Sequence, residues 1–162
     1  MKKNLPFIVI TGLGIFATLF LLYFFVYNMA VSTVREAIFI ERAYPNVKPE
    51  EYVNELKYSA QKNNLSIVEI KNENMYYLVQ MYDESVIDKL AQISPNLVSI
   101  GVVNLVVYSV GNGTGLVANN PYLWDIAIPS SYVDDLAENF SNQLVDIFDG
   151  IYWQIREKKK EL

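Results

Sequence analysis

Cysteine and histidine are both absent from this chain of 162 residues. Without cysteine the protein has no disulfide bond, no thiolate nucleophile and no zinc-thiolate site. Without histidine it lacks the commonest general base and the commonest ligand of metal ions and haem. These absences exclude most familiar catalytic triads and haem sites, and we expect no bound cofactor. The folded part must be held together by core packing.

Basic residues are also missing from a long stretch, since no Lys or Arg occurs between Lys89 and Arg156. The chain carries 13 basic and 18 acidic residues, and without Lys2 and Lys3 the remaining 11 basic residues leave a net charge of −7. A nucleic-acid partner needs a basic surface, so we exclude that class. A basic protein partner or a cation fits this charge. The alternative is that the acidic surface only confers solubility.

An uncharged run from Asn4 to Val34 is the clearest positive feature. Its middle, from Leu5 to Val26, is almost entirely apolar and matches the about 20 residues that a helix needs to cross a bilayer. We therefore predict a transmembrane anchor over residues 1–34. Aromatic residues, Phe25 among them, gather near its C-terminal end, where such rings favour the headgroup region.

The charged residues that flank this run predict its orientation. Lys2 and Lys3 precede the run, whereas Arg35 is followed directly by Glu36. The more basic flank of a span stays in the cytoplasm, so we expect the C-terminal domain on the periplasmic or extracellular side. A cleaved signal peptide is the alternative, but its apolar region is normally only about 7 to 15 residues long. We predict that the span is retained in a single-pass protein of the cell membrane.

Small residues recur in the predicted span. Gly14 and Thr18 are four positions apart, a spacing that lets a second helix approach closely. This pair is our candidate for a contact with a neighbouring membrane helix. The alternative is that small residues are simply common in membrane helices.

The remainder of the chain alternates short apolar segments with amphipathic ones. Aromatic and β-branched composition predicts strands at 37–43, 65–70, 75–81, 98–110 and 116–118. Helical spacing predicts helices at 48–61, after Asp83 or Ser85 up to Pro95, and from Ser131 to about residue 159. The order behind the anchor is β-α-β-β-α-β-β-α. We expect an α+β fold, a two-layer sandwich with a mostly antiparallel sheet, in which 131–162 packs as a C-terminal amphipathic helix on a core of residues 35–130.

Several motifs in this part of the chain occur in the order and spacing of one family. An early helix starts with Pro49-Glu50-Glu51-Tyr52, and the next helix ends with Leu90-Ala91-Gln92-Ile93-Ser94-Pro95. The strand Val102-Val103-Asn104-Leu105-Val106-Val107-Tyr108 is followed by a Gly/Asn turn and the pair Asn120-Pro121. With these motifs, the stretch from Arg42 to Trp124 resembles the domain of unknown function 302 family.

The resemblance implies a compact α+β domain that can pair into dimers. Val102 and Val103 stand where the family's strand motif has Pro and Cys. A cysteine-dependent activity is therefore not implied for this chain. The biochemical role of the family is not established, so the resemblance implies a fold and leaves the chemistry open.

Asp and Glu are the candidate acids and bases that remain. Two pairs lie one helical turn apart, Asp134 with Glu138 and Glu51 with Glu55. Such pairs can share a proton or bind calcium when further oxygen ligands converge on them. No such motif accompanies either pair, so we interpret both as solvated helix faces, with no catalytic residue and no metal site.

The link from Asn119 to Pro129 is irregular in sequence but contains large rings. Tyr122 and Trp124 lie there beside Asp125, and an irregular segment has little need of such rings for its own structure. Together with Asp134 and Glu138 they form the predicted partner or ligand surface.

These observations favour a membrane-anchored, extracytoplasmic interaction module that is not an enzyme. We expect an accessory subunit of a membrane complex, such as a respiratory one, whose partners are the lipid bilayer and either a membrane protein or a second copy of the chain. The alternative is a ligand-binding or sensory domain that holds a small apolar or cationic molecule under residues 122–129. An enzyme that uses only carboxylates is the third hypothesis.

Overall fold

The computed structural model describes residues 5 to 161. The chain divides between Arg35 and Glu36 into two compact units, an N-terminal helical unit and a C-terminal domain. Lys2 and Lys3, on which the predicted orientation depends, lie outside the described residues.

The N-terminal unit consists of most of one helix, α1 (Leu5–Ile38), whose last three residues belong to the domain. The helix is uncharged up to its last turn. Of the described residues, it is the one helix long and apolar enough to cross a membrane. Its polar side chains bond to their own backbone. Thr18 Oγ1 donates to the Gly14 carbonyl at 2.9 Å, and Asn28 Nδ2 donates to the Phe24 carbonyl at 2.7 Å. These bonds satisfy polar groups that would find no hydrogen-bond partner in the lipid tails.

The helix extends beyond residue 34, the predicted end of the anchor, and shifts the first strand. That strand was predicted to begin at Ala37, but β1 (Phe39–Pro45) begins two residues later. Arg35 and Ala37 have high helix propensity, so the helix continues past the end of the apolar run.

The domain is built on a five-stranded sheet in the order β1-β5-β4-β3-β2, with every neighbouring pair antiparallel. The strands after β1 are β2 (Leu65–Asn72), β3 (Tyr76–Asp83), β4 (Val103–Val110) and β5 (Gly113–Asn119). The predicted α+β fold with an antiparallel sheet is confirmed. β4 occupies the centre of the sheet, in agreement with its strongly apolar sequence.

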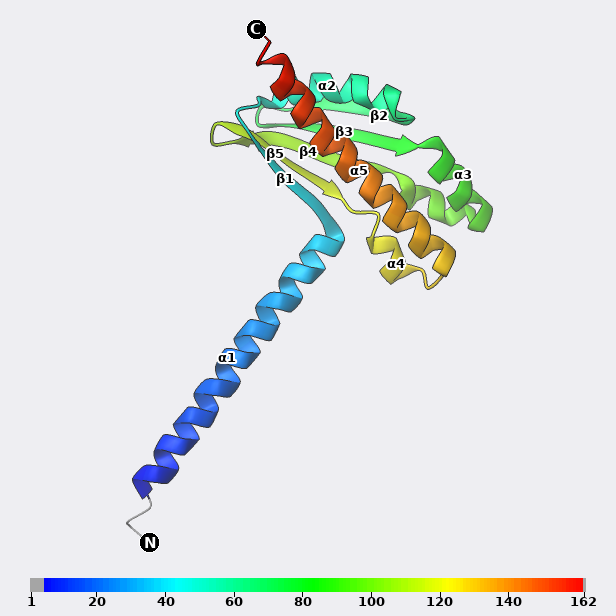
Figure 1. Ribbon diagram of the computed structural model, residues 1–162. Coiled ribbons are helices and arrows are strands. Elements are labelled where there is room, and N and C mark those ends of the chain that lie inside the picture. The colour runs from blue at the N-terminus through cyan, green and yellow to red at the C-terminus, as the bar shows by residue number, and fades with distance from the viewer. Residues whose placement is uncertain (1–4, 162) are drawn as a thin grey trace. The chain divides into compact units, whose positions relative to one another are not determined.

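The long helices of the domain lie on one face of this sheet (Figure 1). The helices of the domain are α2 (Pro49–Lys62), α3 (Glu84–Ile93), the 3-10 helix η2 (Pro95–Gly101), α4 (Leu123–Ala127) and α5 (Ser131–Lys158). Burial alternates along the central strand. Leu105 and Val107 are fully buried under the helices, whereas Asn104 is exposed. The alternation fits a two-layer sandwich in which β4 is buried on one face.

The predicted strand at 98–110 is wrong in its first part, because residues up to Gly101 form η2. Pro95 suits the first turn of this helix, and Leu97 packs against the core. At Gly101 a Cβ atom would lie 2.6 Å from Ile87 Cδ1, so a larger residue here would have to displace the Ile87 side chain. An apolar run has the same composition in a buried helical turn as in a strand, and composition did not separate the two.

β5 is longer than the predicted strand at 116–118, since Gly113 and Gly115 also belong to it. Only Gly111 and Asn112 form the hairpin turn, and Gly111 has a φ of 55°. A Cβ atom at Gly115 would lie 2.5 Å from the ring of Tyr108. The strand glycine therefore makes room for that ring on the neighbouring strand.

Two glycines predict opposite effects of replacement by alanine. A Cβ atom at Gly113 would collide with the backbone of Tyr44 and Pro45, so Gly113→Ala should lower the free energy of unfolding by about 1 to 3 kcal/mol. Gly150 lies inside α5 with no atom within 4 Å of that position, so Gly150→Ala should raise it by about 0.5 to 1 kcal/mol. Urea unfolding of the full chain in detergent micelles measures both changes. Effects of the same sign would contradict the packing described for these two sites.

Candidate functional site

The predicted surface around the link is only partly exposed. Tyr122 has 41% of its surface exposed, but Trp124 has only 4%. The link contains a short helix, α4, and the Trp124 ring packs on Phe140 of α5 with ring centroids 6.0 Å apart. The prediction that Trp124 belongs to a partner surface is therefore wrong, because its ring attaches α4 to the core.

Asn120 organises the same region, although it stood out in the sequence only as part of an Asn-Pro pair. Its backbone N–H donates to the Ile38 carbonyl at 2.8 Å, and its Nδ2 donates to the Glu36 carbonyl at 2.9 Å. Its Oδ1 accepts from the Tyr122 backbone at 3.0 Å and from the Ser141 hydroxyl at 2.7 Å. One side chain thus joins the start of the domain, the link and α5. No local sequence pattern indicates partners so distant in the chain.

The structure brings two of the predicted acidic residues together, Asp125 of α4 and Asp134 of α5. Loss of hydration, followed by the hydrogen bond with Asp125, raises the pKa of Asp134 above its ordinary value. One Asp134 oxygen, Oδ1, is shielded from solvent and has no hydrogen-bond partner among the described residues. Glu138 is exposed on α5 and is not among the groups that shift this pKa. The pair is suited to share one proton, and within residues 5 to 161 no group of three or more acidic side chains is placed to hold a metal ion.

The second carboxylate pair, Glu51 and Glu55 of α2, forms ion pairs instead of a solvated face. Lys159 Nζ lies 2.7 Å from Glu51 Oε2, and Lys158 Nζ lies 2.7 Å from Glu55 Oε2. The hydrogen bond from Lys159 lowers the pKa of Glu51. These ion pairs join the C-terminal end of α5 to α2, so both glutamates have a structural role.

Three tyrosines from β1, α2 and α5 stack on one another. The Tyr44 ring lies 5.3 Å from that of Tyr52 and 5.1 Å from that of Tyr152. The Tyr44 hydroxyl donates to Asp149 Oδ1 at 2.8 Å, and the Tyr52 hydroxyl donates to the Phe148 carbonyl at 3.0 Å. Burial is the main cause that raises the pKa of both hydroxyls, so they stay protonated and act as hydrogen-bond donors within the core.

Apolar side chains also point away from the helices, to the other face of the sheet. In the central strands Leu78 pairs with Val106, and Val106 pairs with Val117; all three are partly exposed. Tyrosine and phenylalanine side chains extend this surface toward the strand ends. We define the open face by the residues Phe39, Tyr76, Leu78, Val106, Tyr108 and Val117. The polar side chains of Glu41, Gln80 and Asn104 lie on the same face of the sheet. No helix among the described residues of the domain lies over it in Figure 1.

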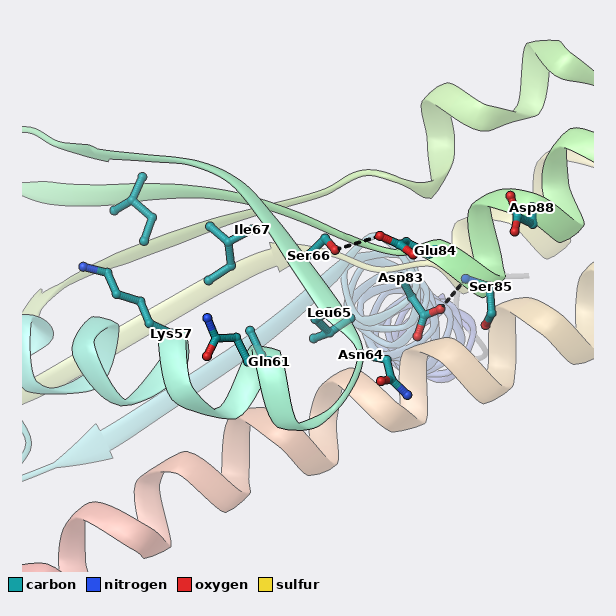
Figure 2. A pocket seen from close by; sticks show the side chains of 12 residues that line it. Lys57, Gln61, Asn64, Leu65, Ser66, Ile67, Asp83, Glu84, Ser85 and Asp88 are labelled. Carbon is teal, nitrogen blue, oxygen red and sulfur yellow. Dashed lines mark hydrogen bonds between the residues drawn. The ribbon is translucent and has the colours of Figure 1, made fainter.

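A groove of about 980 Å³ lies between α2 and β2, an edge strand of the sheet. Apolar side chains of β2 line it on one side, and Lys57 and Gln61 of α2 line it on the other. Figure 2 shows the start of α3 at the far end from Lys57. There Asp83 caps α3, because its Oδ1 accepts from the Ser85 backbone at 2.8 Å. Of the two predicted caps, the structure therefore selects Asp83.

The small residues predicted as a helix contact lie on one side of α1. Gly14 and Thr18 line a shallow depression with Thr11, Ile15 and Leu19. The Thr18 hydroxyl proton is used in the bond to Gly14, so the depression offers mainly a smooth apolar surface. Phe25 is exposed further along the same helix.

No family model matches the sequence, and no curated protein matches it. Among solved structures, the domain is similar to the crystal structure of the uncharacterized conserved protein DUF302 from Bacillus stearothermophilus. The match has a TM-score of 0.61 and covers 69% of this chain and 96% of that chain. The domain has the DUF302 fold. Sequence identity is 10%, so the similarity to the DUF302 protein establishes the fold alone, and it agrees with the resemblance found in the motifs.

The raised pKa of Asp134 predicts a pH-dependent stability. A carboxyl group whose pKa is higher in the folded chain than in the unfolded chain stabilises the fold while it is protonated, and this contribution is lost as the pH rises through the folded pKa. Above pH 3.8, the ordinary pKa of Asp, the free energy of unfolding of Asp134→Asn should therefore rise relative to wild type as the pH increases. Urea unfolding at a series of pH values measures this difference. Glu138→Gln is the matched control. If the difference in the free energy of unfolding between Asp134→Asn and wild type did not change with pH, the raised pKa of Asp134 would be contradicted.

The tyrosine stack predicts a measurable cost for removal of one hydroxyl. Tyr44→Phe deletes the hydrogen bond to Asp149, so the free energy of unfolding should fall by about 1 to 2 kcal/mol. Tyr58→Phe is the control, because this side chain is 72% exposed and its hydroxyl loss should change stability by less than about 0.5 kcal/mol. Equal unfolding midpoints for the two variants would show that the Tyr44 bond contributes nothing.

Proposed function

We propose that this protein is a membrane-anchored, extracytoplasmic interaction module, an accessory subunit of a membrane complex without catalytic activity of its own. The observation that carries the proposal is the open face, an apolar and aromatic surface on a domain joined to a helix long enough to cross a membrane. Clusters of exposed apolar side chains of this kind mark contacts with other proteins.

The apolar helix α1 supports the proposed location at the membrane. α1 bonds its own polar side chains, as at Thr18 and Asn28, so it enters lipid without unsatisfied donors there. Lys2 and Lys3 on the N-terminal side favour a cytoplasmic N-terminus, which puts the domain on the opposite side of the membrane. Gly14 and Thr18 give a neighbouring membrane helix a smooth surface to approach.

The state of the acidic residues favours association over catalysis. Glu51 and Glu55 bind lysines, and these ion pairs join α2 to the C-terminal end of α5. Both glutamates are thus engaged in structural roles. The domain is strongly acidic, so a partner that packs its apolar surface on the open face and carries basic residues around it has the complementary charge.

Purification of the full chain from its native membranes in mild detergent tests the proposal. Val106→Lys puts a charge in the middle of the open face, where Val106 lies outside the buried core, so the domain should stay folded while its partner is lost. Tyr58→Lys on α2 is the matched control and should retain the partner.

Native mass spectrometry of both preparations identifies what is retained. A partner subunit or a second copy of the chain, lost in Val106→Lys and kept in Tyr58→Lys, would support the proposal. A lone monomer of the wild-type chain under these conditions would contradict it. Circular dichroism confirms that each variant is folded.

A further inference from the structure

β2 is an edge strand, and one side of its backbone has no partner strand among the described residues. Unpaired edge strands are templates for an added strand from another chain. A register shift between Ile67 and Glu69 interrupts the pairing with β3 and turns Val68 outward, where it is 60% exposed. Antiparallel pairing continues on both sides of this irregularity, from Leu65 to Asn72.

The helix-side face of the sheet is incompletely covered along this edge. Ile67 and Ile70 point to the same side as the buried Leu65, yet both are only partly buried. The groove of about 980 Å³ lies over these side chains and is walled by Gln61 and Lys57 of α2. This is the space that the inward-facing side chains of one more strand next to β2 would occupy.

The two ends of the groove carry opposite charges. Lys57 lies at one end, whereas Glu84 and Asp88 lie at the other end, where α3 begins (Figure 2). Both Lys57 and Asp88 are exposed, so their charges are available to a bound segment. Asp83 is occupied as the cap of α3, with further contact from Gln143 at 3.5 Å.

We propose that this groove binds an extended segment of a partner protein, which adds to the sheet as a sixth strand antiparallel to β2. Its alternate apolar side chains cover Ile67 and Ile70. An acidic residue at its N-terminal end pairs with Lys57, and a basic residue at its C-terminal end pairs with Glu84 or Asp88. The inference rests on the proposed interaction role, but it concerns a surface separate from the open face and names the kind of partner segment.

An extended peptide fits the groove better than a small molecule does. The groove follows a strand whose free backbone groups recur on both sides of the irregularity at Val68, and a second backbone can pair with both sets. The antiparallel direction continues the pattern of all neighbouring strands. In that direction the N-terminal end of the segment lies beside Lys57 and its C-terminal end lies beside Glu84 and Asp88, so the basic residue belongs at the C-terminal end.

A capped, fluorescein-labelled peptide of sequence Glu-Thr-Val-Thr-Val-Thr-Arg tests the proposal with the full chain in detergent micelles. Its Glu, Val and Arg side chains share one face of a strand and match the groove in order. Fluorescence anisotropy should give a Kd about fivefold lower than for the reversed sequence Arg-Thr-Val-Thr-Val-Thr-Glu, the ratio expected from two exposed ion pairs. Equal binding of the two peptides, or binding of neither, would overturn the proposal.

Variants separate the groove from other surfaces. Ile70→Glu should raise the Kd at least about tenfold, and Lys57→Glu combined with Asp88→Lys should abolish the preference for the forward peptide while leaving the fold intact. Unchanged binding in both variants would overturn the assignment. Val106→Lys should bind the peptide as wild type does. If that variant loses its native partner while wild type binds neither peptide, the groove proposal fails and the open-face proposal stands.

Discussion

One-sided burial of the five-stranded sheet is the constraint on which the rest of this structure depends. Along β4, Leu105 and Val107 lie under the helices, while Val106 points the other way. α2 and α5 close one side of the sheet, and none of the described helices of the domain is left to cover the second side. Both candidate interaction surfaces follow from this shortage, since the open face is the uncovered side and the groove is the uncovered margin beside β2.

Long-range polar bonds attach α5 to the rest of the domain. Tyr44 donates to Asp149, and Lys159 pairs with Glu51. Asp134 of α5 lies beside Asp125 of α4, where loss of hydration and the second carboxyl group raise the pKa of Asp134. In a domain without cysteine, polar side chains such as Tyr44, Asp149 and Glu51 thus serve as structural links between distant elements.

Much of the fold was predictable because it depends on local spacing. The order of the strands and the longer helices and the antiparallel sheet agree with the prediction, and the motifs indicated the DUF302 fold. The candidate site was less predictable. Tyr122 is exposed and Asp125 does meet Asp134, but Trp124 is buried on Phe140 and Glu138 stands apart. An aromatic side chain in a linking segment faces solvent or core according to which elements pack beneath it. The local sequence does not encode those tertiary contacts.

The amino-acid sequence by itself determined the apolar helix, the absence of thiol and imidazole chemistry, and the period of most strands and of the longer helices, since these depend on composition and near neighbours. Only the tertiary structure decided which distant side chains meet. Tyr44 and Asp149 are 105 positions apart, and Glu55 and Lys158 are 103 apart. It also decided which face of the sheet stays uncovered, because that depends on where α2 and α5 pack once the strands have paired.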